Sequence, residues 1–433
     1  MLNHQSCLAG LTFALATAQL TLATPANSSS VQQCAANMNG ILPSFTPSDF
    51  HFSGNIRRYY IAAEQETWDY IPSGWDNWLG VPLDVSPRAN QAGYTKSAGS
   101  YGTSWEKALY RGYTDPSFSE RTEQAATQGI NGPTMRAEVG DLIEILVINK
   151  LSRNYVSMHS MGLSYNKDNE GSLYPNSTSP GSESTPAVGS AIPPGGCFLY
   201  KWVVPEASAP TQSDIVKFWA YHSYVSMPND LNSGLVGPVI VYPRGKMNET
   251  IASHREIVLL YQNFDETMSF LAMENAQKWG GKNATSSSSS SPMPALNLGY
   301  GNYSIWHPQI TNMPTTMLSS TQAPTFHSLN GFSYANNKVF EMCLNDPVIW
   351  YVYAFGMASH VFHLHGNNFV YNGQYIASKS LNDGNMFALQ MNASGPGQWE
   401  LICHVNNHLA DGMVDNYRVY PAGSCPLPKL SGM

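Results

Sequence analysis

The chain carries one pattern twice, and this internal repeat is the feature that most limits what it can fold into. In the first half, Asp141 opens a strand-like run and His159 follows eighteen residues later. In the second half, Asp346 opens a similar run and His363 follows seventeen residues later. Self-similarity over such a length indicates two copies of one structural unit.

Each half also ends on a related segment. The first closes with YHSYVSMPNDLNSGLVGPVIVY at 221–242, and the second closes with CHVNNHLADGMVDNYRVY at 403–420. We therefore place the two domains at about residues 50–245 and 250–424. A short tail, residues 425–433, remains beyond the second domain.

Strand signals dominate both copies. Runs rich in β-branched and aromatic residues, such as RYYIAA at 58–63 and LIEILVIN at 142–149, stand between clusters of Pro, Gly, Asn and Ser. Amphipathic helical periodicity is scarce. The sequence therefore predicts an all-β fold in which each copy is a β-sandwich.

The composition argues against nucleic acid and membrane as partners. Only 12% of the residues are charged and the net charge is −8, so no basic surface for nucleic acid or for an anionic membrane is expected. Beyond the N-terminal leader, no stretch approaches the roughly 20 apolar residues of a membrane span. We expect neither partner.

The N-terminus has the outline of a secretory signal. An apolar run that begins at Leu8 ends in an Ala-Thr-Ala cleavage pattern at 16–18, although no Lys or Arg precedes the run. We assign residues 1–18 to the signal and residues 19–49 to an N-terminal extension. Six Asn-x-Ser/Thr sequons fit a secreted, N-glycosylated protein. They lie at Asn27, Asn176, Asn248, Asn283, Asn302 and Asn392.

The number of cysteines leaves one thiol for another task. Once a signal containing Cys7 is removed, five cysteines remain, and an odd number in a secreted chain leaves one unpaired. We assign that place to Cys403. The other four can pair in three ways. The pairing that we favour is Cys34–Cys425 and Cys197–Cys343.

The stretch WELICHVNNHLADGM, at 399–413, gathers residues that bind metals. Cys403 is followed by His404, His408 and Met413. A thiolate, imidazoles and a weak axial thioether are the ligands of a blue-copper site, which needs one more histidine. The upstream segment ASHVFHLHG offers His360, His363 and His365.

One strand in this stretch could serve two metal sites. If Leu401 to Val405 is a strand, Cys403 points to one side of the sheet, while Ile402 and His404 point to the other. The alternative is a buried core cysteine beside scattered surface histidines.

A long segment, residues 278–322, interrupts the second copy. It contains six consecutive serines, Ser286 to Ser291, followed by sequence rich in Pro and Asn. We expect a flexible, glycosylated surface loop, and the alternative is a lid over a substrate pocket.

Segments typical of one known family run through nearly the whole chain after the signal. They include YYIAAEQETWDY, KALYRGYTDPSF, MRAEVGDLIEILVINKLSRNYVSMHSMGLSYNKDNEGSLYPN, REIVLLYQNFDETMS and HSLNGFSYANN. Together with the two histidine and cysteine motifs, they resemble the multicopper oxidases of the ceruloplasmin–hephaestin branch. This resemblance implies two cupredoxin domains, an electron-transfer (type 1) copper and a three-copper cluster that reduces O₂ to water.

The resemblance implies a complete type 1 site and an incomplete three-copper cluster. The type 1 ligands would be His360, Cys403, His408 and Met413. The family supplies eight histidines to the cluster, and three of these positions are changed. They hold Met161, Tyr224 and Ile402 here. The type 2 copper keeps both of its ligands, His159 and His363.

The two type 3 coppers are affected unequally. One keeps His222 and His404, with Met161 as a candidate soft ligand. The other keeps only His365, so we expect that copper to be absent. The alternative is that these histidines are relics in a polar interface, with Met161 and Tyr224 lining a pocket.

Two functions from different classes fit these features. The first is a secreted, copper-dependent oxidoreductase that takes electrons from a small organic substrate, phenolic or another natural product, with O₂ as a candidate acceptor. The second is a non-redox enzyme whose copper acts as a Lewis acid in dehydration, cyclisation or cycloaddition. A ferroxidase and a copper carrier are further readings. The candidate catalytic residues are Cys403, His404, His327 and Tyr224.

His327, in FHSLNG, marks the expected substrate side. Ferroxidases of this branch bind Fe²⁺ there with one histidine and carboxylates, which suit that hard cation. Here the two acid positions hold Gln322 and Asn407. Neutral amides beside His327 could hydrogen-bond a phenol or a carbonyl, so we expect an aromatic substrate rather than Fe²⁺. The alternative is that both amides are ordinary loop residues.

The resemblance also implies a subunit arrangement. Short two-domain relatives assemble the cluster between the subunits of a trimer. In such a homotrimer, His159 and His222 of one chain would meet His363, His365 and His404 of the next. A monomer closed by a Cys34–Cys425 link is the rival arrangement.

Overall fold

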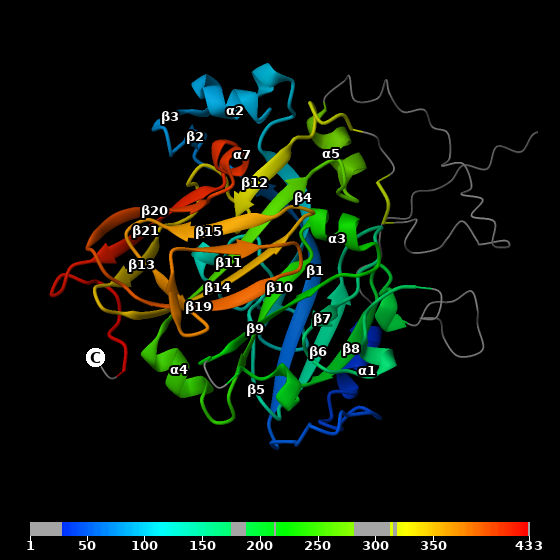
Figure 1. The fold of residues 1–433 in the computed structure, drawn as a ribbon. Coiled ribbons are helices and arrows are strands. Elements are labelled where there is room, and N and C mark those ends of the chain that lie inside the picture. The colour runs from blue at the N-terminus through cyan, green and yellow to red at the C-terminus, as the bar shows by residue number, and fades with distance from the viewer. Residues whose placement is uncertain (1–27, 175–187, 212–213, 281–311, 315–317, 432–433) are drawn as a thin grey trace, which may run out of the picture.

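A computed structural model describes residues 28–174, 188–211, 214–280, 312–314 and 318–431 (Figure 1). Its strands form four main sheets, two in the first half of the chain and two in the second, and the helices are short. The predicted all-β fold of two cupredoxin units is confirmed. The domain boundaries at residues 245 and 250 stay a prediction.

The first half packs two four-stranded sheets around one apolar core, to which Ile145 of one sheet and Val239 of the other contribute. The sheet orders are β4-β1-β6-β8 and β5-β10-β9-β7. The strands are β1 (Ile56–Asp69), β4 (Ser104–Tyr113), β5 (Met135–Glu138), β6 (Leu142–Asn149), β7 (His159–Met161), β8 (Cys197–Val203), β9 (Lys217–His222) and β10 (Val236–Tyr242).

The second half repeats this plan with larger sheets, in the orders β12-β11-β14-β19-β16-β17 and β13-β21-β20-β15-β18. The strands are β11 (Arg255–Asp265), β12 (Thr325–Leu329), β13 (Phe340–Cys343), β14 (Pro347–Phe355), β15 (His360–Leu364), β16 (Phe369–Tyr371), β17 (Gln374–Ile376), β18 (Ser378–Leu381), β19 (Met386–Asn392), β20 (Gly397–Cys403) and β21 (Val414–Tyr420).

Strand β14 shows how the two halves join. Its residues are buried on both faces, and side chains alternate along a strand. Trp350 points into the core of the second half, while Tyr351 joins a core that residues of the first half share. Buried hydrogen bonds such as Asn131 Nδ2 to Asn330 Oδ1, at 2.9 Å, also cross between the halves. The two units therefore pack through a common interior.

The segment between β1 and β4, residues 70–103, lies above helix α7 in Figure 1, and we call it the cap. It reaches from the first half onto the second, where Ser73 Oγ donates to Asn336 Oδ1 at 2.6 Å. Its elements are β2 (Trp75–Asp76), β3 (Val81–Pro82), α2 (Pro87–Gln91) and the 3-10 turns Leu83–Val85 and Lys96–Ala98.

The remaining helices lie at the edges of the sheets. They are α1 (Ser28–Ala36), α3 (Met227–Ser233), α4 (Met247–Ser253), α5 (Ala272–Trp279) and α7 (Asn406–Ala410). None of the helices in the described part of the chain is long and apolar enough to cross a membrane.

The expected disulfide pairing is wrong. The structure joins Cys34 to Cys197 and Cys343 to Cys425, so each bond stays within one half. Helix α1 packs on β8, which places Cys34 beside Cys197. Cys343 ends β13, which pairs with β21, and the tail that follows β21 carries Cys425. The expectation that Cys403 is the free thiol is confirmed.

Several expectations fall outside the described residues. They are the signal at residues 1–18, most of the 278–322 segment, and the sequons at Asn27, Asn176, Asn283 and Asn302. The other two sequons, Asn248 in α4 and Asn392 at the end of β19, are exposed.

Candidate metal centre

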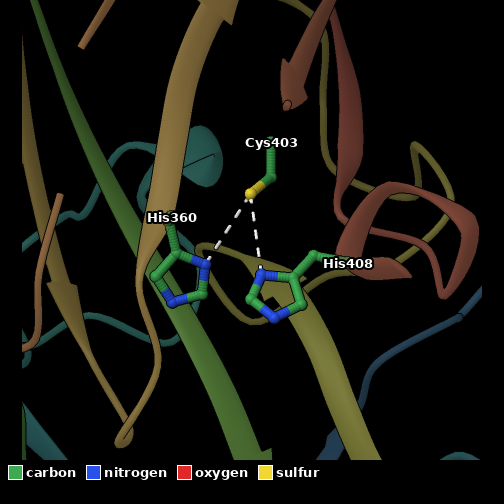
Figure 2. A group of neighbouring side chains, drawn as sticks. All are labelled: His360, Cys403 and His408. Atoms are coloured by element: carbon green, nitrogen blue, oxygen red, sulfur yellow. Dashed lines mark hydrogen bonds between the residues drawn. The ribbon is translucent and has the colours of Figure 1, made fainter. Parts of the chain in front are cut away.

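Three side chains of ligand type converge in the second half (Figure 2). His360 Nδ1 lies 3.8 Å from Cys403 Sγ, and His408 Nδ1 lies 3.7 Å from the same sulfur. All three residues are buried. Within the described part of the chain, this is the one place where ligand atoms of three or more His, Cys, Asp or Glu residues come within 4.8 Å of one another.

Local structure explains why these residues meet. Strands β20 and β15 pair so that Cys403 lies opposite Phe362, close to His360 at the start of β15. The short helix α7 follows at once and carries His408 back toward the sulfur. The turn ends at Gly412, whose φ of +105° favours glycine.

Met413, the fourth residue of the predicted type 1 set, lies directly under this turn. It is fully buried in the same apolar cluster as Cys403. Its backbone carbonyl accepts from Cys403 N at 3.0 Å, and its own N–H donates to His408 O at 2.9 Å. These bonds hold the thioether residue beside the other three.

Burial sets the protonation states of the three converging side chains. It lowers the pKa of His360 to about 3, helped by the nearby rings of His408 and His327, and it lowers the pKa of His408 as well. Both imidazoles are therefore neutral, with lone pairs free for a metal. Burial raises the pKa of the Cys403 thiol, which a bound metal would lower again. Two neutral imidazoles and a sulfur, shielded from water, fit copper.

His327 extends this cluster toward the surface. Its ring centre lies 4.9 Å from that of His408, and 14% of its side chain is exposed. Tyr94 Oη from the cap lies 3.3 Å from His327 Nδ1, and Asp411 Oδ2 lies 3.8 Å from the same nitrogen. Burial lowers the pKa of His327 to about 4 and raises that of Asp411.

The two amides expected beside His327 are placed differently. Gln322 turns away, because its Nε2 donates to Tyr101 Oη at 3.1 Å and its Oε1 accepts from Ser319. Asn407 lies in α7 directly before His408 and is exposed. The polar side chains that lie beside His327 Nδ1 are therefore those of Tyr94, at 3.3 Å, and Asp411, at 3.8 Å.

The histidines of the first half form a separate group with Tyr224. His159 and His222 are paired across β7 and β9, with ring centres 5.6 Å apart. Tyr224 lies 5.4 Å from the His159 ring and 5.7 Å from the His222 ring. On the side facing the second half, His222 packs against Phe355 at 5.5 Å.

Met161, at the end of β7, also borders the second half. A Cβ built on Gly384 would lie 3.7 Å from Met161 Cε. The described neighbours of this group across the domain contact therefore include Phe355 and Gly384 of the second half.

The histidines of the second half line the outer face of β15 and β20. His363 lies 5.3 Å from the His365 ring and 5.5 Å from the His404 ring, measured between ring centres. Ile402 pairs directly with His363. Cys403 faces the core instead, so the Cys403 sulfur and the His404 ring point to different sites. Strand β20 ends at Cys403 rather than at the expected Val405.

Three of these histidines are held by the same device. The Nδ1 atoms of His159, His222 and His363 lie 2.8, 2.9 and 2.7 Å from backbone carbonyls. A carbonyl can only accept, so Nδ1 carries the proton and Nε2 keeps its lone pair. Ligand histidines in metal sites are held in this way. The rings are therefore oriented as ligands although they form two separate groups.

His365 is held by a side chain instead of a carbonyl. Its Nδ1 lies 3.6 Å from Glu400 Oε2, and Trp78 Nε1 in the cap donates to Glu400 Oε1 at 3.0 Å. A carboxylate behind a histidine raises its basicity as a ligand. At 3.6 Å this is an ion-pair distance rather than a hydrogen bond, so the His365 ring is held less closely than the three rings bonded to backbone carbonyls.

Three residues beside the histidines were not predicted from the sequence: Asp411, Glu400 and Asn263. Asn263 Nδ2 lies 3.4 Å from His408 Nε2. Asp411 and Glu400 carry a usable signal, since each is an acid inside the 399–413 motif. Asn263 carries none, because only the register between β11 and β12, which sets Asn263 opposite His327, brings it to the site.

Comparisons with known proteins agree with this geometry. Two family models, both described as multicopper oxidase, match residues 113–246 and 307–423, together more than half of the chain. The ferroxidase HEPHL1 of Mus musculus is 31% identical over 387 residues, which are 87% of this chain and 30% of that protein. Hephaestin of Homo sapiens is 30% identical over 382 residues, 86% of this chain and 30% of that protein.

The chain spans about a third of the length of the curated relatives it matches. Among solved structures, a blue copper oxidase from Nitrosomonas europaea aligns with a TM-score of 0.50 at 14% identity. That alignment covers 84% of this chain and 86% of the other. At this identity the likeness concerns the fold alone.

Proposed function

Because the chain belongs to the multicopper oxidase family, in its ceruloplasmin- and hephaestin-like branch, we propose that it is a copper-dependent oxidoreductase acting on a small aromatic substrate. Copper is the cofactor of this family, whose members act on small molecules with O₂. The observation that carries the proposal is the unbroken contact from Cys403 through His408 to His327.

The residues divide the work between a buried and an exposed part. His360, Cys403, His408 and Met413 would hold a copper, which would supply a one-electron acceptor. The protein keeps both imidazoles neutral and excludes water from the three ligands, since all are buried. His327, whose ring packs against that of His408 and is partly exposed, offers the outer contact.

The substrate edge is formed by His327 and Asp411. A phenol that loses an electron also loses its hydroxyl proton, so the site needs an acceptor for that proton. Asp411 Oδ2 lies 3.8 Å from His327 Nδ1 and the Asp411 side chain is 27% exposed, which supports this carboxylate as the acceptor for a phenol bound beside His327. It can accept the hydrogen bond first and the proton afterwards.

The oxygen side of the reaction needs residues that one chain keeps apart. His159 and His222 lie in one group, and His363, His365 and His404 lie in another. We propose that a second copy of this chain brings the groups together, in the homotrimer that the family resemblance implies. Ile402 cannot ligate, so the cluster would hold fewer than three coppers.

The test uses 2,6-dimethoxyphenol as the probe, with O₂ uptake and product formation measured together. In His327→Ala we expect kcat/KM to fall about tenfold or more, since tenfold corresponds to about 1.4 kcal/mol of lost transition-state contact. The blue absorption should remain. His254→Ala is the matched control, because the hydrogen bonds of its ring, to Ser253 and Thr250, lie outside the copper site. Unchanged kcat/KM in His327→Ala would refute the proposed electron path through His327 and His408 to the copper site.

Iron is the second candidate substrate, and one observation favours it. Asp411 gives the His327 edge a hard oxygen ligand that the sequence comparison of acid positions had missed. A mouse relative is named a ferroxidase. Asp411→Asn should abolish Fe²⁺ oxidation if iron is the substrate. If the substrate is a phenol, Fe²⁺ oxidation by the unaltered protein should be slow and independent of Asp411.

We also propose that the protein is secreted and N-glycosylated. Support comes from the exposure of the sequons at Asn248 and Asn392. Treatment with an N-glycosidase should lower the mass of the secreted protein, and an unchanged mass would contradict the proposal.

A further inference from the structure

The imidazole of His408 is enclosed on every side that the structure describes. The His360 ring lies 4.8 Å away on one side and the His327 ring 4.9 Å away on another. Nδ1 faces Cys403 Sγ at 3.7 Å, while Nε2 faces the amide of Asn263 at 3.4 Å. Asn263 is buried and lies on β11, directly across from His327 on β12.

The amide of Asn263 stands with its NH₂ toward His408 and its oxygen without a partner. Nδ2 is the atom 3.4 Å from His408 Nε2, and Oδ1 is buried and accepts no hydrogen bond. A buried acceptor without a partner is unfavourable. The nitrogen and oxygen of an amide are nearly indistinguishable by shape, so their assignment follows from the hydrogen-bond network.

The metal chemistry decides which orientation holds in the loaded protein. If His408 binds copper through Nδ1, the atom that faces the sulfur, then Nε2 must carry the proton. Two N–H groups cannot hydrogen-bond to each other, whereas the reversed amide accepts from Nε2–H through Oδ1. The reversal gives the buried oxygen its partner and fixes the imidazole in the tautomer that copper needs.

We propose that Asn263 is a positioning residue for His408: its carbonyl oxygen accepts the Nε2–H, holds the ring toward Cys403 and closes the outer edge of the imidazole. This inference rests on the proposed copper site. With the edge of His408 closed, a substrate cannot hydrogen-bond to it directly. The outer contact therefore falls to His327, whose ring packs against that of His408 and is partly exposed.

Two substitutions of Asn263 test the orientation of the amide. Asn263→Leu keeps the volume and removes the acceptor, and loss of such an outer partner lowers metal affinity by about 10- to 100-fold. Asn263→Asp offers oxygen atoms only, so it should keep the affinity for Cu²⁺ within a few-fold. It should also lower the reduction potential of the blue copper, because a negative partner stabilises the oxidised metal.

The measurements are Cu²⁺ titration of the metal-free protein, followed by the visible spectrum and a redox titration. Asn367→Leu is the control, since Asn367 is equally buried in the same half and bonded to Tyr417 and Ser394. It should cost stability while leaving copper affinity and spectrum unchanged.

The outcomes separate this inference from the proposed function. A colourless copper-loaded wild type would reject the copper site itself. A blue wild type with Asn263→Leu of equal affinity would reject the role of Asn263. If Asn263→Asp were as damaging as Asn263→Leu, the amide would present its NH₂ to His408 and the orientation inferred above would be wrong.

Discussion

Two sets of potential copper ligands differ in how the fold arranges them: the ligands of the cysteine site converge, whereas the histidines of the expected three-copper cluster are separated. At the cysteine site, His360, Cys403 and His408 come together in a buried cluster. Five histidines that the family resemblance assigns to the three-copper cluster, which we call the dispersed histidines, are divided between the two halves. They are His159, His222, His363, His365 and His404. Three of them nevertheless keep the ring orientation of metal ligands.

This difference teaches that orientation and convergence have separate causes. Orientation is set within one half of the chain, because a carbonyl such as that of Ala377 holds the ring of His363. Convergence depends on how sheets and chains pack. On the core face of β20, Cys403 is packed against Phe362 and its neighbours, so a change there would disturb the interior. On the outer face, Ile402 could replace a ligand without disturbing that core.

The largest expected effect is that of Cys403→Ser. The strong visible absorption of a blue copper site arises from the thiolate, so we expect it to vanish completely in this variant. The β-sheet signature in far-ultraviolet circular dichroism should stay, because the side chains are nearly equal in volume. A variant that still turned blue with copper would place the thiolate ligand elsewhere.

The next effect concerns the dispersed histidines. The triple variant Met161→His, Tyr224→His and Ile402→His should raise the number of bound coppers per chain, because imidazoles then stand at all the lost positions. Elemental analysis measures this number. Ile402→Leu is the control and should leave it unchanged. A triple variant that folds and assembles but gains no copper would mean that packing, rather than ligand loss, limits the cluster.

The smallest effect is expected at the carboxylate behind His365. Trp78→Phe removes the donor to Glu400, and Glu400→Leu removes the carboxylate itself. Each should weaken Cu²⁺ binding at the dispersed histidines by about tenfold while the blue absorption stays. Trp75→Phe is the control, because Trp75 lies in the same cap and is exposed. Equal copper affinity in all variants would show that His365 binds no metal.

The ligand residues of the cysteine site could be read from the sequence because they lie close together along it. Cys403, His408 and Met413 lie in one short segment, which helix α7 and the turn at Gly412 fold back on itself. The runs of β-branched and aromatic residues between turn clusters likewise predicted an all-β fold, and the repeat predicted two copies of it. Short-range patterns of this kind depend little on distant packing.

Features that depend on packing between distant parts of the chain were either not predicted or predicted wrongly. Asn263 is set beside His408 by the pairing of β11 with β12, which no local pattern encodes. The disulfides follow the packing of α1 on β8 and of β13 beside β21. Gln322 shares the right stretch of sequence with His327, yet Tyr101 of the cap draws its amide away.

The contrast between the two kinds of site is tested most directly by one sample of copper-replete protein. Its copper content per chain, visible absorption and electron paramagnetic resonance should be measured together. We predict a blue protein with one to three coppers per chain, fewer than the four of a complete set. A colourless sample would remove the cysteine site from the description, and four tightly bound coppers would show that the dispersed histidines form a complete cluster after all.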